Sequence, residues 1–126
     1  MKGYLLDTHA FIWWLNNSPE LSKTARKTIS SPENTIFFSH VSYWEMAIKV
    51  SIGRLEFPME AIDLELQKNS FELLTISSPH ILQSTKFPMI HRDPFDRLLM
   101  AQAKVEKLTL LSVDKFIHQY DVVCVW

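Results

Sequence analysis

The sequence predicts an α/β fold built on a mainly parallel central sheet of four to five strands. Two observations support this prediction. Short apolar segments alternate with helical patterns along the 126 residues, and the apolar segments are continuous rather than alternating with polar residues. Continuous apolar strands are typical of a parallel sheet that helices cover on both faces. The order of strands and helices therefore favours a three-layer α/β/α sandwich.

The strands are expected where short apolar runs are bounded by polar residues, at 4–6, 35–38, 73–76, 109–112 and 122–126. The helices are expected at 9–16, 20–30, 43–51, 59–68, 79–84 and 94–106. Within 20–30, Leu21, Ala25 and Ile29 recur at helical spacing, and the other long segments show the same periodicity. No repeat or linker interrupts the chain, so we expect a single domain over residues 1–126.

Composition excludes several classes of protein. Hydrophobic residues make up 47% of the chain, which is too many for a disordered protein. The formal net charge of -1 excludes a broadly basic nucleic-acid coat, although RNA can still be held at one site through metal ions. The single cysteine, Cys124, forbids an internal disulfide and suits a reducing compartment.

The apolar N-terminal segment does not predict a leader or a membrane anchor. Asp7 and His9 interrupt its apolar run, and no small-residue cleavage site follows. No run approaches the roughly 20 apolar residues that cross a bilayer. We therefore expect a cytoplasmic protein that does not associate with membranes.

Four acidic residues stand where a parallel sheet presents its ligand site. Asp7 ends the apolar segment GYLLD, and Asp114 follows the segment LTLLSV. Glu45 follows the second strand in HVSYWE, and Asp96 lies at the head of the long helix in DPFDRLL. Ligands of open α/β sheets bind beyond the carboxyl ends of the strands, so these acids are expected to meet there.

Each acid also has an ordinary structural explanation. Asp93, followed by Pro94 and Asp96, matches the start of a helix, and Ser42 with Glu45 matches a capping box. Asp7 suits a helix cap, and Asp114 suits a turn. Capping does not, however, explain why two apolar strands both end at an acid on the same edge of the sheet.

Four converging carboxylates require a cation. Each pair about 5 Å apart costs about 3 kcal/mol at an effective dielectric constant of about 20. Mg²⁺ or Mn²⁺ suits a set of carboxylate ligands, and it leaves coordination positions for water and phosphate. The chemistry expected of such a site is hydrolysis of a phosphodiester bond by metal-activated water.

The ordered segments LLDT, SYWE, HRDPFDRLL and LLSVD resemble PIN-domain ribonucleases, and among them VapC-like toxins of VapBC toxin–antitoxin systems. The resemblance spans nearly the whole chain and implies a PIN-like α/β/α sandwich that cleaves RNA endonucleolytically with Mg²⁺ or Mn²⁺. It also implies a cognate antitoxin partner and a homodimer. The family's catalytic and metal-binding acids fall on Asp7, Glu45, Asp96 and Asp114. Thr8 and Ser112 match polar positions that orient these acids, and Asp93 is expected to cap the helix first and assist the site second.

Basic residues near the acids are candidates for RNA contacts. Arg92 and Arg97 flank Asp93 and Asp96, and they suit either phosphate contacts or salt bridges to neighbouring acids. Lys49 and Arg54 follow Glu45 and suit either an RNA groove or a solvated helix face.

Trp13 and Trp14 point to different faces of their predicted helix. We expect one of these two rings in the core and the other in an exposed apolar patch, with burial of both beneath the 20–30 helix as the alternative.

Two other functions compete with the ribonuclease hypothesis. A receiver-like phospho-accepting module is also α/β with acids at its strand ends. Such a module normally has paired acids after the first strand, where this chain has only Asp7. A PIN scaffold that has become a binding protein without activity is the other alternative. The apparently complete set of four acids speaks against it.

Overall fold

The computed structural model describes residues 2–88 and 93–126. In this part of the chain, five strands form one sheet in the order β3-β2-β1-β4-β5. The strands are β1 (Lys2–Leu6), β2 (Asn34–Ser39), β3 (Glu72–Leu74), β4 (Thr109–Leu111) and β5 (Cys124–Val125). All neighbouring pairs are parallel, and Leu5 of β1 faces Phe37 on one side and Leu110 on the other. The predicted parallel sheet is confirmed.

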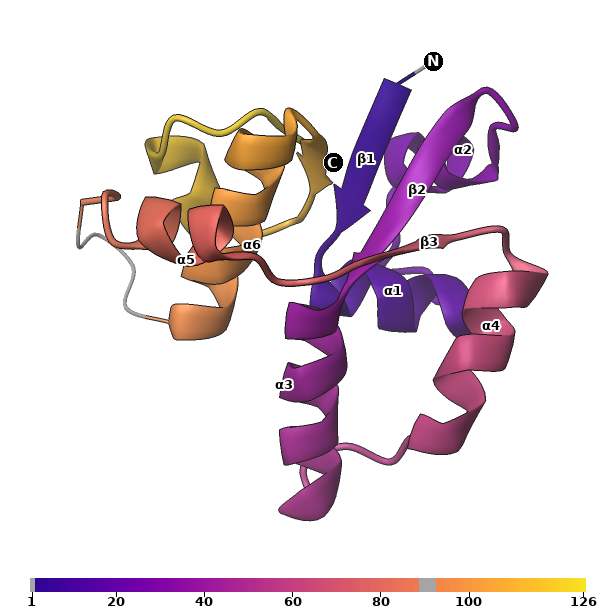
Figure 1. Ribbon diagram of the computed structural model, residues 1–126. Helices are drawn as coiled ribbons and strands as arrows, with labels where there is room; N and C mark the ends of the chain where they lie inside the picture. The colour runs from indigo at the N-terminus through magenta and orange to yellow at the C-terminus, as the bar shows by residue number, and fades with distance from the viewer. Residues whose placement is uncertain (1, 89–92) are drawn as a thin grey trace.

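The connections between strands are helical. The α-helices are α1 (Thr8–Leu15), α2 (Lys23–Ser30), α3 (His40–Ser51), α4 (Ile62–Lys68), α5 (Ser78–Ser84) and α6 (Pro94–Glu106). Two 3₁₀ segments add η1 (Met59–Ala61) before α4 and η2 (Lys115–Gln119) after β4. Figure 1 shows α5 and α6 on one side of the sheet and α1, α2 and α4 on the other, with α3 running on from β2 beyond the carboxyl ends of the strands.

Two separate cores lie against the two faces of the sheet. Successive residues of a strand point to opposite faces, so Leu6 packs with Phe11, Ile36 and Phe38 while Leu5 packs with residues of the other core. The first core also holds Ala25 and Ile29 of α2 and Ile62 and Leu66 of α4. The second holds Leu99, Met100, Ala101 and Ala103 of α6. This arrangement confirms the α/β/α sandwich, because each face of the sheet is covered by helices.

Helix α6 begins and ends where its sequence directs. The Asp93 carboxylate accepts hydrogen bonds from the backbone N–H groups of Phe95 and Asp96, and Pro94 occupies the first turn, where its missing N–H costs nothing. The helix ends at Lys107, whose φ of 58° lies in the left-handed region. The prediction that Asp93 caps this helix is confirmed.

Helix α3 begins earlier than predicted. The expected start was residue 43, with Ser42 and Glu45 as a possible capping box. Instead Ser39, the last residue of β2, caps the helix by accepting from the backbone N–H of Val41 at 2.9 Å. The capping-box reading is wrong, and Glu45 lies in the second turn.

Trp13 and Trp14 are both partly buried, so the prediction of one core ring and one exposed ring is wrong. Trp13 stacks on His9 and meets Trp126 edge-on. Trp14 packs near Phe71, and its indole N–H donates to Asn69 Oδ1 at 3.0 Å. The C-terminal strand and the end of α4 cover the two rings, which local periodicity could not reveal.

A buried polar network ties α3, α5 and α6 together. The Ser39 hydroxyl donates to Gln102 Oε1, and Gln102 Nε2 donates to the carbonyl of Thr75. His80 accepts from the backbone N–H of Ser77 at Nδ1, so its Nε2 carries the proton and donates to Glu106 Oε2 at 2.7 Å.

Among the helices of residues 2–88 and 93–126, none is long and apolar enough to cross a bilayer.

Candidate active site

An acidic pocket of about 130 Å³ lies at the carboxyl edge of the sheet, between the starts of α1 and α6 and the side of α3. Its lining consists of Asp7, Thr8, His9, Glu45, Lys49, Asp93, Asp96, Val113 and Asp114. All four acids that the sequence singled out therefore line one pocket, although they come from four distant segments. Parallel strands that end at one edge bring the segments together, as expected for an open α/β sheet.

Asp7 and Asp114 are placed by the ends of neighbouring strands. The backbone N–H of Asp7 extends the β1–β4 pairing by donating to the carbonyl of Leu111 at 3.1 Å. The Asp7 side chain then caps α1, because its Oδ1 accepts from the backbone N–H of Ala10 at 2.7 Å. Asp114 caps η2 in the same manner by accepting from the backbone N–H of Phe116 at 2.9 Å. Both acids thus cap a helical segment and face the pocket.

Glu45 is buried on α3 and has two fixed partners. The Thr8 hydroxyl donates to Glu45 Oε1 at 2.6 Å and lies 2.9 Å from the hydroxyl oxygen of Ser42. Lys49, one turn further along α3, forms an ion pair with Glu45 Oε2 at 3.1 Å. These contacts set the direction of the Glu45 carboxylate and join α3 to the start of α1.

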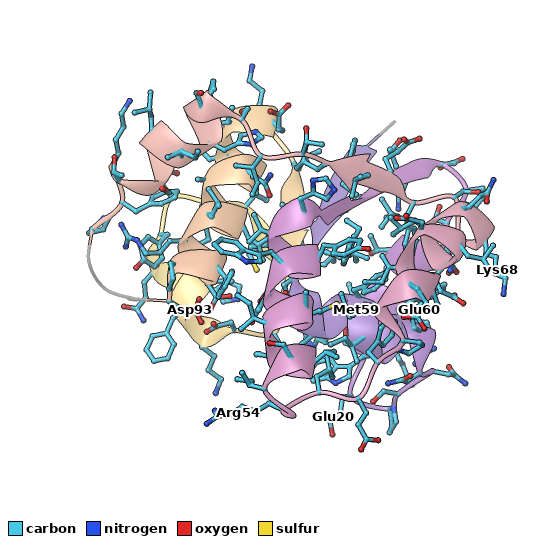
Figure 2. All side chains as sticks on the ribbon, turned by 60° about the horizontal axis from the view of Figure 1, so that its bottom comes forward. Glu20, Arg54, Met59, Glu60, Lys68 and Asp93 are labelled. Carbon is cyan, nitrogen blue, oxygen red and sulfur yellow. The ribbon has the colours of Figure 1, made fainter. Side chains whose placement is uncertain are left out.

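Asp96 lies in the first turn of α6, directly behind the Asp93 cap. Figure 2 shows Asp93 at the start of α6. The partial positive charge of the helix N-terminus favours anionic groups at this position. The two aspartates therefore share one helix start, and both line the pocket.

Ser112 is buried at the end of β4 and contacts two of the acids. Its hydroxyl accepts from the backbone N–H of Asp114 at 3.1 Å, and its side chain hydrogen-bonds to the Asp7 carboxylate. Thr8 and Ser112 thus hold the carboxylates of Glu45 and Asp7 by hydrogen bonds.

The pocket disfavours negative charge on Asp7. Burial raises the pKa of this carboxyl from 3.8 to about 6, since the ionised form loses its hydration. Hydrogen bonds from Ser112 and from the Ala10 backbone lower the pKa, His9 lowers it further, and the charge of Asp96 raises it. The balance indicates a group that would gain from a cation placed beside it.

The donor chemistry of the pocket fits a hard divalent cation, because carboxylate and hydroxyl oxygens are the ligands that Mg²⁺ and Mn²⁺ prefer. Over residues 2–88 and 93–126, no three His, Cys, Asp or Glu side chains form a ready-made ligand group. The carboxylates are instead held by backbone caps, by Thr8 and by Lys49.

The predicted RNA-contacting cations have different environments. Lys49 lines the pocket but is paired with Glu45. Arg54 is exposed beyond the end of α3 and does not line the pocket. Arg92 lies outside the described residues.

Arg97 is held by backbone carbonyls. Its side chain is buried, and its guanidinium donates to the backbone carbonyls of Ser84, Phe87 and Pro88 at 2.9 to 3.0 Å. These bonds fasten the segment after α5 to α6. These contacts show that Arg97 supports the fold, and its contact with a phosphate stays a prediction.

Sequence reasoning overlooked two aromatic residues beside the pocket. Trp44 precedes Glu45 on α3, Phe95 precedes Asp96 on α6, and their ring centroids lie 5.2 Å apart. The signal that could have found them is the position of each ring directly before an acid of the site.

The fold and the pocket define the class of protein: an α/β protein with an acid-rich site at the carboxyl edge of a parallel sheet. The family model of the PIN domain matches residues 4–123, so the chain belongs to the PIN domain family.

Solved structures share this fold. A chain of VapBC2 from Rickettsia felis bound to a DNA fragment from the promoter superimposes with a TM-score of 0.74 at 17% identity, over 98% of this chain and 97% of that one. A chain of VapBC-1 from nontypeable Haemophilus influenzae gives a TM-score of 0.68 at 19% identity, covering 98% and 96%. A chain of a toxin-antitoxin complex from Klebsiella pneumoniae gives 0.58 at 20%, covering 88% and 86%. A search of curated proteins gives no significant match.

Proposed function

We propose that this PIN domain is a metal-dependent endoribonuclease and the toxin of a toxin–antitoxin pair. It hydrolyses RNA phosphodiester bonds with Mg²⁺ or Mn²⁺ bound by Asp7, Glu45, Asp96 and Asp114. The observation that carries the proposal is the meeting of these four acids in one pocket at the carboxyl edge of the sheet. PIN domains are generally nucleases, and several proteins of the same fold belong to VapBC or toxin–antitoxin complexes.

Each residue of the pocket has a defined task in this proposal. A divalent cation supplies a water of lowered pKa and shields the phosphate charge. Asp7 and Asp114 are fixed by the helical segments that they cap, so both carboxylates are directed before any cation binds. Thr8 holds Glu45 and Ser112 holds Asp7. Asp93 fixes the first turn of α6 and thereby the position of Asp96.

The ribonuclease is tested by cleavage of single-stranded RNA in the presence of Mg²⁺ or Mn²⁺. Cleavage is expected to stop with a chelator and in the Asp7→Asn and Asp96→Asn variants. Asp63→Asn is the matched control, because Asp63 is an exposed acid in the first turn of α4 that does not line the pocket. Parent-like cleavage by both pocket variants would contradict the assignment of the site.

The proposed partners follow from the same family. They are an RNA substrate in the cytoplasm, a cognate antitoxin that inhibits the chain, and a second copy in a homodimer. Copurification with the product of a small neighbouring gene that also carries a DNA-binding segment would support the toxin assignment. Unchanged growth on induced expression without that gene would contradict it.

A PIN-fold binding protein without activity is the second candidate. It is favoured by one observation: among the described residues no three potential ligands form a ready-made group, and Lys49 already neutralises Glu45. Absence of cleavage with every divalent cation, together with binding of a protein partner, would select this candidate.

A receiver-like module has less support, because Glu45 lies within a helix and the family is PIN. Stable phosphorylation of Asp7 by a small phosphodonor would be its distinguishing result.

A further inference from the structure

Two aromatic side chains beside the acidic pocket have no task in the proposed chemistry. Trp44 lies on α3 directly before Glu45, and Phe95 lies in the first turn of α6 directly before Asp96. The Trp44 side chain is 57% exposed, although an indole ring is usually well buried. Neither ring lines the pocket itself, but each directly precedes an acid that does, Glu45 on α3 or Asp96 on α6, and the contact between the rings joins these two helices.

The ring contact leaves much of the indole accessible. The centroids are 5.2 Å apart and the ring planes meet at 76°, which is an edge-to-face arrangement. Phe95 is partly buried and packs against the second core, so it anchors the pair to the body of the molecule. Trp44 is therefore held in place on one side and open to solvent on the other.

Two cations of this region are already engaged in other contacts. Lys49 is paired with Glu45 at 3.1 Å, and the buried Arg97 donates to three backbone carbonyls. The pocket itself is anionic and the chain carries a formal net charge of -1. A contact to an uncharged base of the substrate adds nothing to the repulsion between these acids and the phosphates.

We propose that Trp44, supported by Phe95, is a stacking platform for an unpaired base of single-stranded RNA next to the phosphate that is cleaved. The proposal rests on the ribonuclease function and names the form of RNA that the site takes. Proteins commonly recognise single-stranded RNA by stacking unpaired bases on aromatic rings, and every base offers a face for such stacking. Trp44 is then a substrate-positioning residue that contacts a base while the carboxylates act on its neighbouring phosphate.

The test is binding of a fluorescent twelve-residue oligoadenylate to the parent chain, measured with a chelator present so that no cleavage occurs. A twelve-residue oligomer of abasic ribose phosphate is the second probe. Replacing Trp44 by Leu is expected to weaken oligoadenylate binding about 5- to 100-fold, the range for one lost base stack, and to leave the abasic oligomer unaffected. Trp44→Phe is expected to restore most of the affinity.

Ile52→Ser is the matched control, because Ile52 is 60% exposed at the end of α3 and does not line the pocket. Equal affinity of the parent and Trp44→Leu proteins for oligoadenylate would overturn the platform, and so would equal affinity of the parent for the two probes. Conversion of a dimer to a monomer by Trp44→Leu, with loss of binding, would also overturn it and assign the ring to an interface between copies. Cleavage by the parent chain is measured separately, so failure of the ribonuclease proposal is distinguishable from failure of the platform.

Discussion

Two polar clusters lie within this small fold, and they differ in how their charges are balanced. In the network that joins α3, α5 and α6, the side chains of Ser39, His80 and Gln102 are buried and Glu106 lies at the exposed end, and each of these side chains has a partner. The acidic pocket brings carboxylates together instead, and burial raises the pKa of Asp7 to about 6. Over the described residues, no buried side-chain nitrogen or oxygen lacks a partner, so the pocket is unusual in its charge rather than in its hydrogen bonding.

The comparison teaches that hydrogen bonding alone does not distinguish a structural cluster from a functional one. A network in which every polar group is paired stabilises the packing of helices. A set of buried acids opposes folding until a cation or a proton joins it. Variants in which stability and RNA cleavage are both measured therefore test which cluster supports the fold and which supports activity.

Asp7→Asn is expected to have the largest effect. Asparagine caps a helix about as well as aspartate, so the bond from the Ala10 backbone survives while the ligand charge is lost. We expect RNA cleavage to fall by more than about 100-fold, since changing even the partners of metal ligands commonly costs 10- to 100-fold. Steady-state cleavage together with chemical denaturation checks this. A variant that lost both activity and stability would show that Asp7 serves the fold.

The second-largest effect is expected in how the free energy of unfolding depends on pH, because the folded state raises the pKa of Asp7. Because the folded pKa of Asp7 is raised from 3.8 to about 6, the folded state holds a proton that the unfolded state loses between these values. This group therefore contributes a decline in the free energy of unfolding as pH rises from about 4 to about 6, by about 3 kcal/mol at most. With a chelator present, Asp7→Asn should match the parent near pH 4 and exceed it at pH 7. Equal stabilities at both pH values would refute the raised pKa.

His80→Leu breaks the structural cluster. The backbone N–H of Ser77 and one oxygen of Glu106 lose their partner, so the free energy of unfolding should fall by about 1 to 3 kcal/mol. The cleavage rate of the folded fraction should remain at the parent level. His118→Leu, at an exposed position, serves as the control and should shift stability by less than about 0.5 kcal/mol. A selective loss of cleavage by His80→Leu would assign the buried network to the site.

Lys49→Met is expected to act mainly on metal affinity. The Lys49 side chain is 39% exposed but that of Glu45 is only 10% exposed, so loss of this half-buried pair should lower the free energy of unfolding by about 1 kcal/mol or more. Removing its charge frees Glu45, so the affinity for Mn²⁺ should rise. Calorimetric titration of the variant decides this, and weaker Mn²⁺ binding would show that Lys49 assists the site in another way.

The sequence alone was sufficient to predict the sheet and the meeting of the acids. Continuous apolar strands determine a parallel sheet, and a parallel sheet brings the residues after Leu6 and Leu111 to one edge. Local patterns also predicted the Asp93 cap of α6. These features depend on short-range chemistry and on a general rule of topology.

Features that depend on tertiary packing could not be predicted in this way. Helix α3 begins at His40, three residues before the predicted start, and Ser39 caps it, because the strand and helix join without a loop. The guanidinium of Arg97 donates to three backbone carbonyls at and after the end of α5. No periodic pattern in the sequence predicts this contact. The exposure of Trp44 and the partial burial of Trp13 and Trp14 depend on which helices and strands cover each ring.

The central claim is that Asp7, Glu45, Asp96 and Asp114 together bind a divalent cation. Calorimetric titration of the full chain with Mn²⁺ at pH 7 tests it without reference to any substrate. Saturable binding by the parent and Asp63→Asn proteins, abolished in Asp7→Asn and in Asp96→Asn, is the predicted result. Undiminished Mn²⁺ binding in both pocket variants, or no binding by the parent chain, would contradict the account.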